Sequence, residues 1–116
     1  MNNINSINHS VVIANRFNST VLDISEICYL QQEGDKIIIH LMDRSVWERN
    51  SMETILDRLD GGNFFRCHHS LAVNIDHIKG FRDDREIILD NGTVLTMCRA
   101  ACLKTKKAWR DYIYND

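Results

Sequence analysis

The chain has 116 residues, of which 44% are hydrophobic and 26% charged, so it can bury one hydrophobic core and is too short for several domains. Its apolar runs are only a few residues long, which excludes a transmembrane helix, and a net charge of −2 excludes attachment to DNA or anionic lipid by bulk charge alone. The first residues lack the basic and apolar regions of a signal peptide, and four cysteines without a CxxC pair favour a reducing cytoplasm.

The first half of the chain is predicted to form short β-strands. Residues 1–8 contain four Asn residues and are expected to be a flexible tail or the remnant of a linker. Apolar and β-branched runs then alternate with polar turns, which is typical of an all-β domain. The predicted strands cover residues 11–13, 20–22, 24–30, 36–42 and 45–49, and a turn is expected at 31–35.

A single helix is predicted to interrupt these strands. Ser51 is a good N-cap, and the apolar side chains of Met52, Ile55, Leu56 and Leu59 fall on one helical stripe. The glycine pair at 61–62 is expected to end this helix.

Strand patterns resume after the glycine pair and lead to a closing helix. The Asn91–Gly92 pair predicts a hairpin turn between the last two strands, because Asn-Gly is the strongest short-range turn signal. A helix is predicted from about residue 99 to residue 112, with its lysines mostly opposite its apolar side. The predicted strands cover residues 64–66, 70–75, 86–89 and 94–97.

Charge is unevenly distributed along the chain. Residues 1–59 carry five basic and eight acidic groups, a net charge of −3, whereas residues 60–110 carry nine basic and six acidic groups, a net charge of +3. This asymmetry is compatible with one positive face that binds an anionic partner. From charge alone, the solvated surface of a C-terminal helix is the favoured interpretation.

Neither a metal site nor an enzyme active site is expected. The segment Cys67–His69 with Cys98 and Cys102 offers enough ligand types for zinc, and His40 is a further candidate. However, adjacent residues on a strand point to alternate faces, so that Cys67 and His69 should share one face and Arg66 and His68 the other. No nucleophile elbow, glycine-rich phosphate loop or pocket with paired carboxylates is recognisable, so no cofactor is predicted.

The stretch FFRCHHSLAVN at residues 64–74 resembles the signature of the LytTR family, whose pattern is roughly F-x-R-x-H-R-S-x-x-V-N. This family comprises DNA-binding domains without a helix-turn-helix, found at the C-termini of many bacterial response regulators. The resemblance extends over about residues 10–110 with order and spacing preserved. It includes the strand at 24–30, the helix at 51–59, the Asn91–Gly92 turn, and Arg99 at the end of the last strand.

The resemblance implies a mostly β, LytTR-like fold of about ten short strands in small sheets, with a short central helix and a C-terminal helix, over residues 9–116. It also implies sequence-specific binding of double-stranded DNA through loops inserted in the major groove. Two copies would bind direct repeats in promoters. A phosphorylatable receiver domain would belong to the full-length protein, a cytoplasmic response regulator that has no contact with a membrane.

Three residues are implied to read or flank bases: Lys36, His69 and Arg99. The family usually has Arg where this chain has His69, and the shorter imidazole cannot make the bidentate Arg–guanine contact that contributes about 1–3 kcal/mol. Either the base preference changes at this position or His69 contacts only phosphate. The remaining candidates for DNA contact are Arg66, which could instead pair with Asp60 or Asp76, and Lys104, Lys106 and Lys107, which also suit a solvated helix face.

Two other functions remain open at this point. The same fold could have lost DNA binding and serve as a protein-interaction or anti-activator module, as His69 and the negative net charge suggest. A redox- or metal-responsive regulator is the third possibility, in which Cys67 beside Arg66 and His68 has a lowered pKa. The alternative for Cys67 is a small buried hydrophobe.

Overall fold

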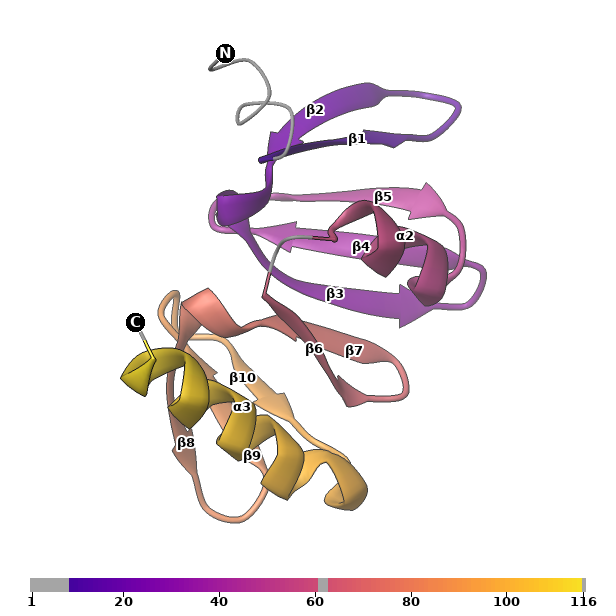
Figure 1. Cartoon of the computed structure of the whole chain (residues 1–116). Helices are drawn as coiled ribbons and strands as arrows, with labels where there is room; N and C mark the ends of the chain where they lie inside the picture. The colour runs from indigo at the N-terminus through magenta and orange to yellow at the C-terminus, as the bar shows by residue number, and fades with distance from the viewer. Residues whose placement is uncertain (1–8, 61–62, 116) are drawn as a thin grey trace.

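The computed structural model describes residues 9–60 and 63–115, so the expected tail at 1–8 and the glycine pair at 61–62 lie outside the described residues. Within them the chain is mostly β, as predicted, with ten short strands (Figure 1). The strands are β1 (Ser10–Ala14), β2 (Ser19–Asp23), β3 (Ile27–Glu33), β4 (Lys36–Leu41), β5 (Ser45–Arg49), β6 (Phe64–His68), β7 (Leu71–Asn74), β8 (Ile78–Arg82), β9 (Glu86–Leu89) and β10 (Val94–Thr96). The α-helices are α2 (Met52–Arg58) and α3 (Cys102–Tyr114), and three 3-10 turns are η1 (Ile24–Glu26), η2 (Ile75–His77) and η3 (Arg99–Ala101).

The strands form three antiparallel sheets. A β1–β2 hairpin lies at one end of the molecule, a five-stranded sheet of order β5-β4-β3-β7-β6 lies in the middle, and a three-stranded sheet of order β10-β9-β8 lies at the other end beside α3 (Figure 1). Most pairs join strands adjacent in sequence. The pairing of β3 with β7, in which Tyr29 lies opposite Val73, is the long-range contact that joins strands β3–β5 of the central sheet to the β6–β7 hairpin.

The central sheet buries apolar side chains on both faces. Successive residues of a strand point to opposite faces, and these strands carry apolar residues at both odd and even positions. Leu30, Ile37 and Ile39 pack in a core shared with α2 and the β1–β2 hairpin. Cys67 and Val73 pack in a second core shared with the three-stranded sheet and α3. The sheet therefore fixes the positions of the two outer parts.

The predicted central helix is confirmed. The Ser51 side chain caps it by accepting a hydrogen bond of 3.1 Å from the Thr54 N–H, and Met52 and Ile55 are fully buried. The helix ends at Arg58, with Leu59 as its C-cap. No helix in the described part of the chain is long and apolar enough to span a bilayer.

Some predicted strand residues form 3-10 turns instead. Residues 24–26 and 75–77 are η1 and η2, because the side chains of Asp23 and Asn74 accept hydrogen bonds from backbone N–H groups two residues later and so compete with strand pairing. The turn expected at 31–35 is shorter, since β3 continues to Glu33 and only Gly34 and Asp35 form the turn. Gly34 has a φ of +63°, which glycine adopts without strain.

Candidate nucleic-acid interface

Three connections project from one side of the molecule (Figure 1). They are the β3–β4 turn at Gly34–Asp35, the β6–β7 turn at His69–Ser70, and the segment from Cys98 to Ala101 that precedes α3. Each carries or adjoins one residue implied to read or flank bases, namely Lys36, His69 and Arg99. We call this side the turn face.

The β3–β4 turn presents cations whose positions are restrained. The Lys36 ammonium lies 4.9 Å from the centre of the Trp47 ring, which is a cation–π contact. On the neighbouring strand, Arg49 forms an ion pair of 2.6 Å with Asp35. Arg49 was not predicted as a site residue. Its place beside Lys36 follows from the β4–β5 register, in which the two residues are opposite each other.

The β6–β7 turn is held by several hydrogen bonds. The Arg66 guanidinium donates to the His69 carbonyl at 2.6 Å and pairs with Glu53 of α2 at 3.0 Å. The prediction that Arg66 pairs with Asp60 or Asp76 is therefore wrong. It pairs with Glu53 because α2 lies alongside β6. His68 Nδ1 accepts a hydrogen bond from the Ser70 N–H at 3.2 Å. The exposed His69 ring lies against the His68 ring, with centroids 4.3 Å apart.

Cys67 occupies an irregularity of β6 that the sequence pattern does not reveal. The pairing of β6 with β7 shifts between Arg66 and His68, so the alternation of side chains is broken there. Cys67 is fully buried, whereas His69 lies in the exposed turn, and the expectation that they share a face is wrong. Burial raises the pKa of the Cys67 thiol to about 12. A redox-sensing cysteine requires a lowered pKa, so that prediction for Cys67 is also wrong.

We expect Arg66→Ala to loosen the β6–β7 turn and to lower the affinity for the DNA that the family resemblance implies as the ligand, by about 0.5–1.5 kcal/mol, the usual contribution of one hydrogen bond. Arg66→Lys is the matched control, since it keeps the charge and loses the forked geometry that reaches both Glu53 and His69. If Arg66 acts by positioning the turn, both variants should show faster amide exchange at residues 68–70 and weaker binding. Full affinity in the lysine variant would instead mean that Arg66 acts only as a charge.

The third connection contributes to a shallow hollow between the β8–β9 turn and the start of α3. Its volume is about 330 Å³, and it is lined by Asp84, Arg85, Arg99, Cys102, Leu103 and Lys106. Arg85 was not predicted as a site residue. It is brought to Arg99 because its carbonyl accepts a hydrogen bond of 2.8 Å from Met97, at the end of β10. The hairpin predicted at Asn91–Gly92 implies this proximity, since it places the residue before β9 opposite the residue after β10.

The start of α3 favours an anion. The 3-10 turn η3 runs directly into α3, its N-cap Cys98 makes no side-chain hydrogen bond, and neither η3 nor the first turn of α3 contains an acidic residue. Of the predicted lysines, Lys106 lines the hollow and also donates to the Asp84 carbonyl at 3.4 Å. Lys104 is exposed, and Lys107 forms an ion pair of 2.8 Å with Asp111. The structure therefore brings Arg99 and Lys106 together and directs Lys107 to a carboxylate of its own helix.

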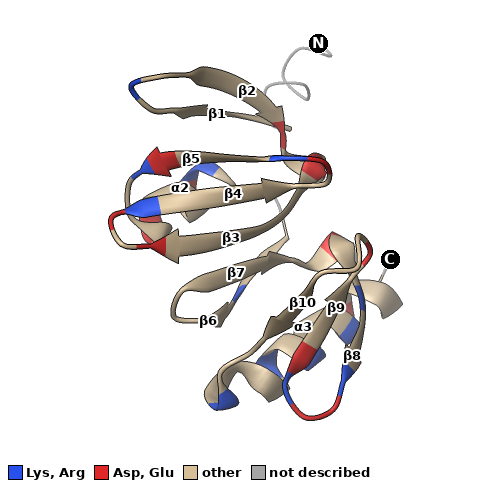
Figure 2. Ribbon diagram, turned by 180° about the vertical axis from the view of Figure 1, so that it is seen from behind, with Lys and Arg blue, Asp and Glu red and all other residues tan. Residues whose placement is uncertain are grey.

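Positive charge on the turn face is local. Figure 2 shows Lys and Arg interleaved with Asp and Glu over the sheets. The hollow, in contrast, is lined by three cations and only one carboxylate, that of Asp84. The cations are Arg85, Arg99 and Lys106. This is the part of the turn face best suited to a phosphate group.

The candidate metal ligands considered from the sequence do not converge on one point in the described residues, although the Cys98 N–H donates to the Cys67 carbonyl at 3.0 Å. His40 stacks on Tyr29 with centroids 4.1 Å apart, and His68 bonds within its own turn. Among the described residues, a group of three ligand types within reach of one ion comes instead from Cys28, His77 and Asp90. Sequence reasoning missed this group, since its members are far apart in the chain.

Comparisons with known proteins agree with the observed fold. A family model described as the LytTr DNA-binding domain matches residues 18–110. A solved structure described as the LytTr DNA-binding domain of a response regulator from Bacillus cereus shares the fold, with a TM-score of 0.73 and 21% identity. The similarity covers 86% of this chain and 95% of that chain. Among curated proteins, none matches this chain.

Proposed function

The chain belongs to the LytTR family of DNA-binding domains, and we propose that it binds double-stranded DNA sequence-specifically through the turn face, as the output domain of a transcriptional response regulator in the cytoplasm. The observation that carries this proposal is the placement of Lys36, His69 and Arg99 on three connections of one side (Figure 1). Turns held by a rigid β scaffold are a common way to present contact residues.

Phosphate contacts would come mainly from the hollow. The start of the helical segment at η3, where the N-cap Cys98 makes no side-chain hydrogen bond and two arginines and a lysine lie around the hollow, suits one phosphate of the DNA backbone. Such a contact also explains the position of Arg99. A cation at the positive end of a helix is unfavourable by itself, and a bound phosphate reverses that effect. A phosphate fixed there would orient the Arg99 guanidinium toward the neighbouring base edges.

Base recognition would differ between the connections. Arg99 has the two parallel donors that match the O6 and N7 atoms of guanine. His69 offers a single hydrogen bond, so its contribution to base preference should be smaller than that of an arginine. Lys36, held over the Trp47 ring, has a compact charge better suited to phosphate than to bidentate base contact.

The family resemblance supports the finer points of the proposal. Two copies of the domain would bind direct repeats in promoter DNA, and a phosphorylatable receiver domain would control their association. The alternative, a protein-interaction module without DNA binding, predicts no preferred duplex at all. One selection experiment separates the two.

Selection from a random pool of double-stranded DNA should enrich paired direct repeats. We further expect His69→Arg to add a guanine preference at one position in each half-site, because the longer side chain restores a bidentate contact. Asn115→Arg, at the end of α3, adds the same charge away from the turn face and should leave the selected sequence unchanged. A folded protein that enriches no sequence above a scrambled duplex at low salt would contradict the proposal.

A further inference from the structure

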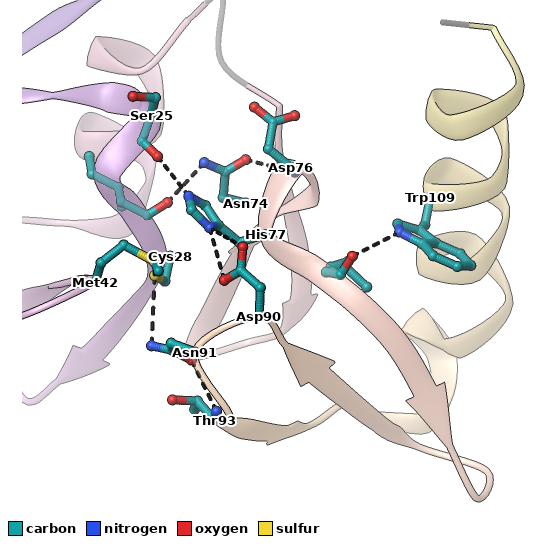
Figure 3. Close-up of polar contacts among 12 residues, drawn as sticks. Ser25, Cys28, Met42, Asn74, Asp76, His77, Asp90, Asn91, Thr93 and Trp109 are labelled. Carbon is teal, nitrogen blue, oxygen red and sulfur yellow. Dashed lines mark hydrogen bonds and ion pairs between the residues drawn. The ribbon is translucent and has the colours of Figure 1, made fainter.

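Three side chains with different ligand atoms converge on the side of the molecule opposite the turn face (Figure 3). Cys28 comes from β3, His77 from η2, and Asp90 from the turn after β9. One sulfur, one nitrogen and one oxygen atom of this trio all lie within 4.8 Å of one another. The trio joins the central sheet to the three-stranded sheet.

His77 has the hydrogen bonding of a metal-binding histidine. Its Nε2 lies 2.6 Å from the carbonyl oxygen of Ser25, so this nitrogen carries a hydrogen and donates. Its Nδ1 faces the two carboxylate oxygens of Asp90 at 2.9 and 3.1 Å. Because an ionised carboxylate only accepts, a proton or a metal ion must lie between these groups. Histidines that bind metals typically donate their other N–H to a backbone carbonyl in this manner.

Cys28 adds a soft ligand in a buried position. Its Sγ lies 3.3 Å from the Met42 Sδ and 3.8 Å from the Asn91 Nδ2, which donates to it. Burial, and then the charge of Asp90, raise the pKa of the Cys28 thiol. A thiolate here would therefore need a nearby positive ion. Sulfur and imidazole ligands select zinc and similar ions over magnesium or calcium.

We propose that Cys28, His77 and Asp90 form a binding site for Zn²⁺. On binding, the Cys28 thiol releases one proton to solvent, and the proton between the His77 Nδ1 and the Asp90 carboxylate is released as well. The ion then takes the thiolate sulfur, the imidazole nitrogen and a carboxylate oxygen, with water in the fourth position. Tetrahedral zinc needs these atoms closer together, at metal–ligand distances of about 2.0–2.3 Å. Asp90 can supply this movement, since its side chain is 43% exposed and lies in a turn.

Zinc binding should stabilise the folded chain, because the trio is assembled only when the two sheets are in contact. Zinc binding by the trio does not depend on DNA binding by the turn face. A chain that binds no DNA could still bind zinc, and a chain that binds no zinc could still bind DNA.

The test is a titration of the reduced, metal-free chain with Co²⁺, which reports thiolate ligation by a charge-transfer absorption band in the near ultraviolet. We expect one equivalent to bind with this band, Zn²⁺ to remove it by displacement, and Zn²⁺ to raise the Tm. Cys28→Ser should abolish the band and the rise in Tm. Cys98→Ser, which removes a thiol outside the trio, should keep both.

The result that would overturn the proposal is a band that persists in Cys28→Ser or is absent from the unchanged chain. Circular dichroism establishes whether each variant folds. If Cys28→Ser does not fold, Asp90→Asn provides the test, because it keeps the thiol and replaces the anionic carboxylate ligand with a neutral amide. We expect at least about tenfold weaker Co²⁺ binding in Asp90→Asn, and unchanged affinity would equally overturn the site.

Discussion

Replacing Arg99 with alanine should weaken binding to the selected duplex by about 1–3 kcal/mol, roughly 5- to 150-fold, and remove the base preference at one position of each half-site. The guanidinium lies on the exposed segment before α3, beside the hollow that suits a phosphate. Alanine cannot replace its two parallel donors. Fluorescence anisotropy with the selected duplex and with single-base variants of it measures both effects.

Arg85→Ala is the comparison that distinguishes base contact from phosphate contact. Arg85 shares the hollow with Arg99, so its loss should weaken binding to all sequences and reduce the slope of log K against log salt by about one unit. If Arg99→Ala behaves in the same way and leaves the base preference intact, Arg99 contacts only phosphate. If Arg99→Ala has no effect on affinity, the turn face is not the DNA-binding surface.

Replacing Glu48 with glutamine should destabilise the fold by about 2–3 kcal/mol. Glu48 is only 7% exposed, and its carboxylate accepts hydrogen bonds from the Ala14 N–H at 3.0 Å and from Asn50 at 2.8 Å. It also pairs with Arg58 of α2 at 2.7 Å. These contacts tie the β1–β2 hairpin and α2 to β5. Glutamine loses the charge and leaves Arg58 without its partner.

The same carboxylate should make stability depend on acidity. Hydrogen bonding to Arg58, more than any other cause, lowers the pKa of Glu48 from 4.5 to about 2. A lowered carboxyl pKa contributes stability that is complete above the unfolded-state value and is lost as the pH falls toward the folded-state value. Between about pH 5 and pH 2, the unchanged chain should therefore lose more stability than Glu48→Gln.

Urea unfolding at pH 7, 4 and 2.5 measures this difference. The control is Glu33→Gln at the exposed end of β3, which should change the free energy of unfolding by less than about 0.5 kcal/mol. A constant difference between Glu48→Gln and the unchanged chain at all three pH values would contradict the role assigned to the ionised carboxylate.

Local patterns in the sequence predicted the elements whose stability is local. The helix after Ser51 follows from its cap and its apolar stripe, and the strand at 36–41 follows from its β-branched run. The 3-10 turns η1 and η2 were missed because Asp23 and Asn74 act through side-chain hydrogen bonds that strand alternation does not register. Strand β8 was missed because Lys79 and Gly80 interrupt its apolar pattern.

The candidate site was predictable only in part. Lys36, His69 and Arg99 came from the family resemblance, since nothing in their spacing brings them to one side. The partners that define their surroundings depend on tertiary contacts. Arg85 reaches Arg99 through pairing at the end of β10, and Glu53 reaches Arg66 through the packing of α2. The first contact follows from the hairpin predicted at Asn91–Gly92, whereas no short-range rule predicts the packing of α2 beside β6.

The most direct test of the turn face as the DNA-binding surface is a titration of the isotope-labelled chain with the selected duplex, followed by amide chemical shifts in NMR spectra. We predict that the largest changes occur at residues 34–36, 68–70 and 98–106, and that Ser25, His77 and Asp90 on the opposite side change little. Largest changes around His77 and Asp90, or on the β1–β2 hairpin, would show that DNA binds elsewhere and would contradict the proposal.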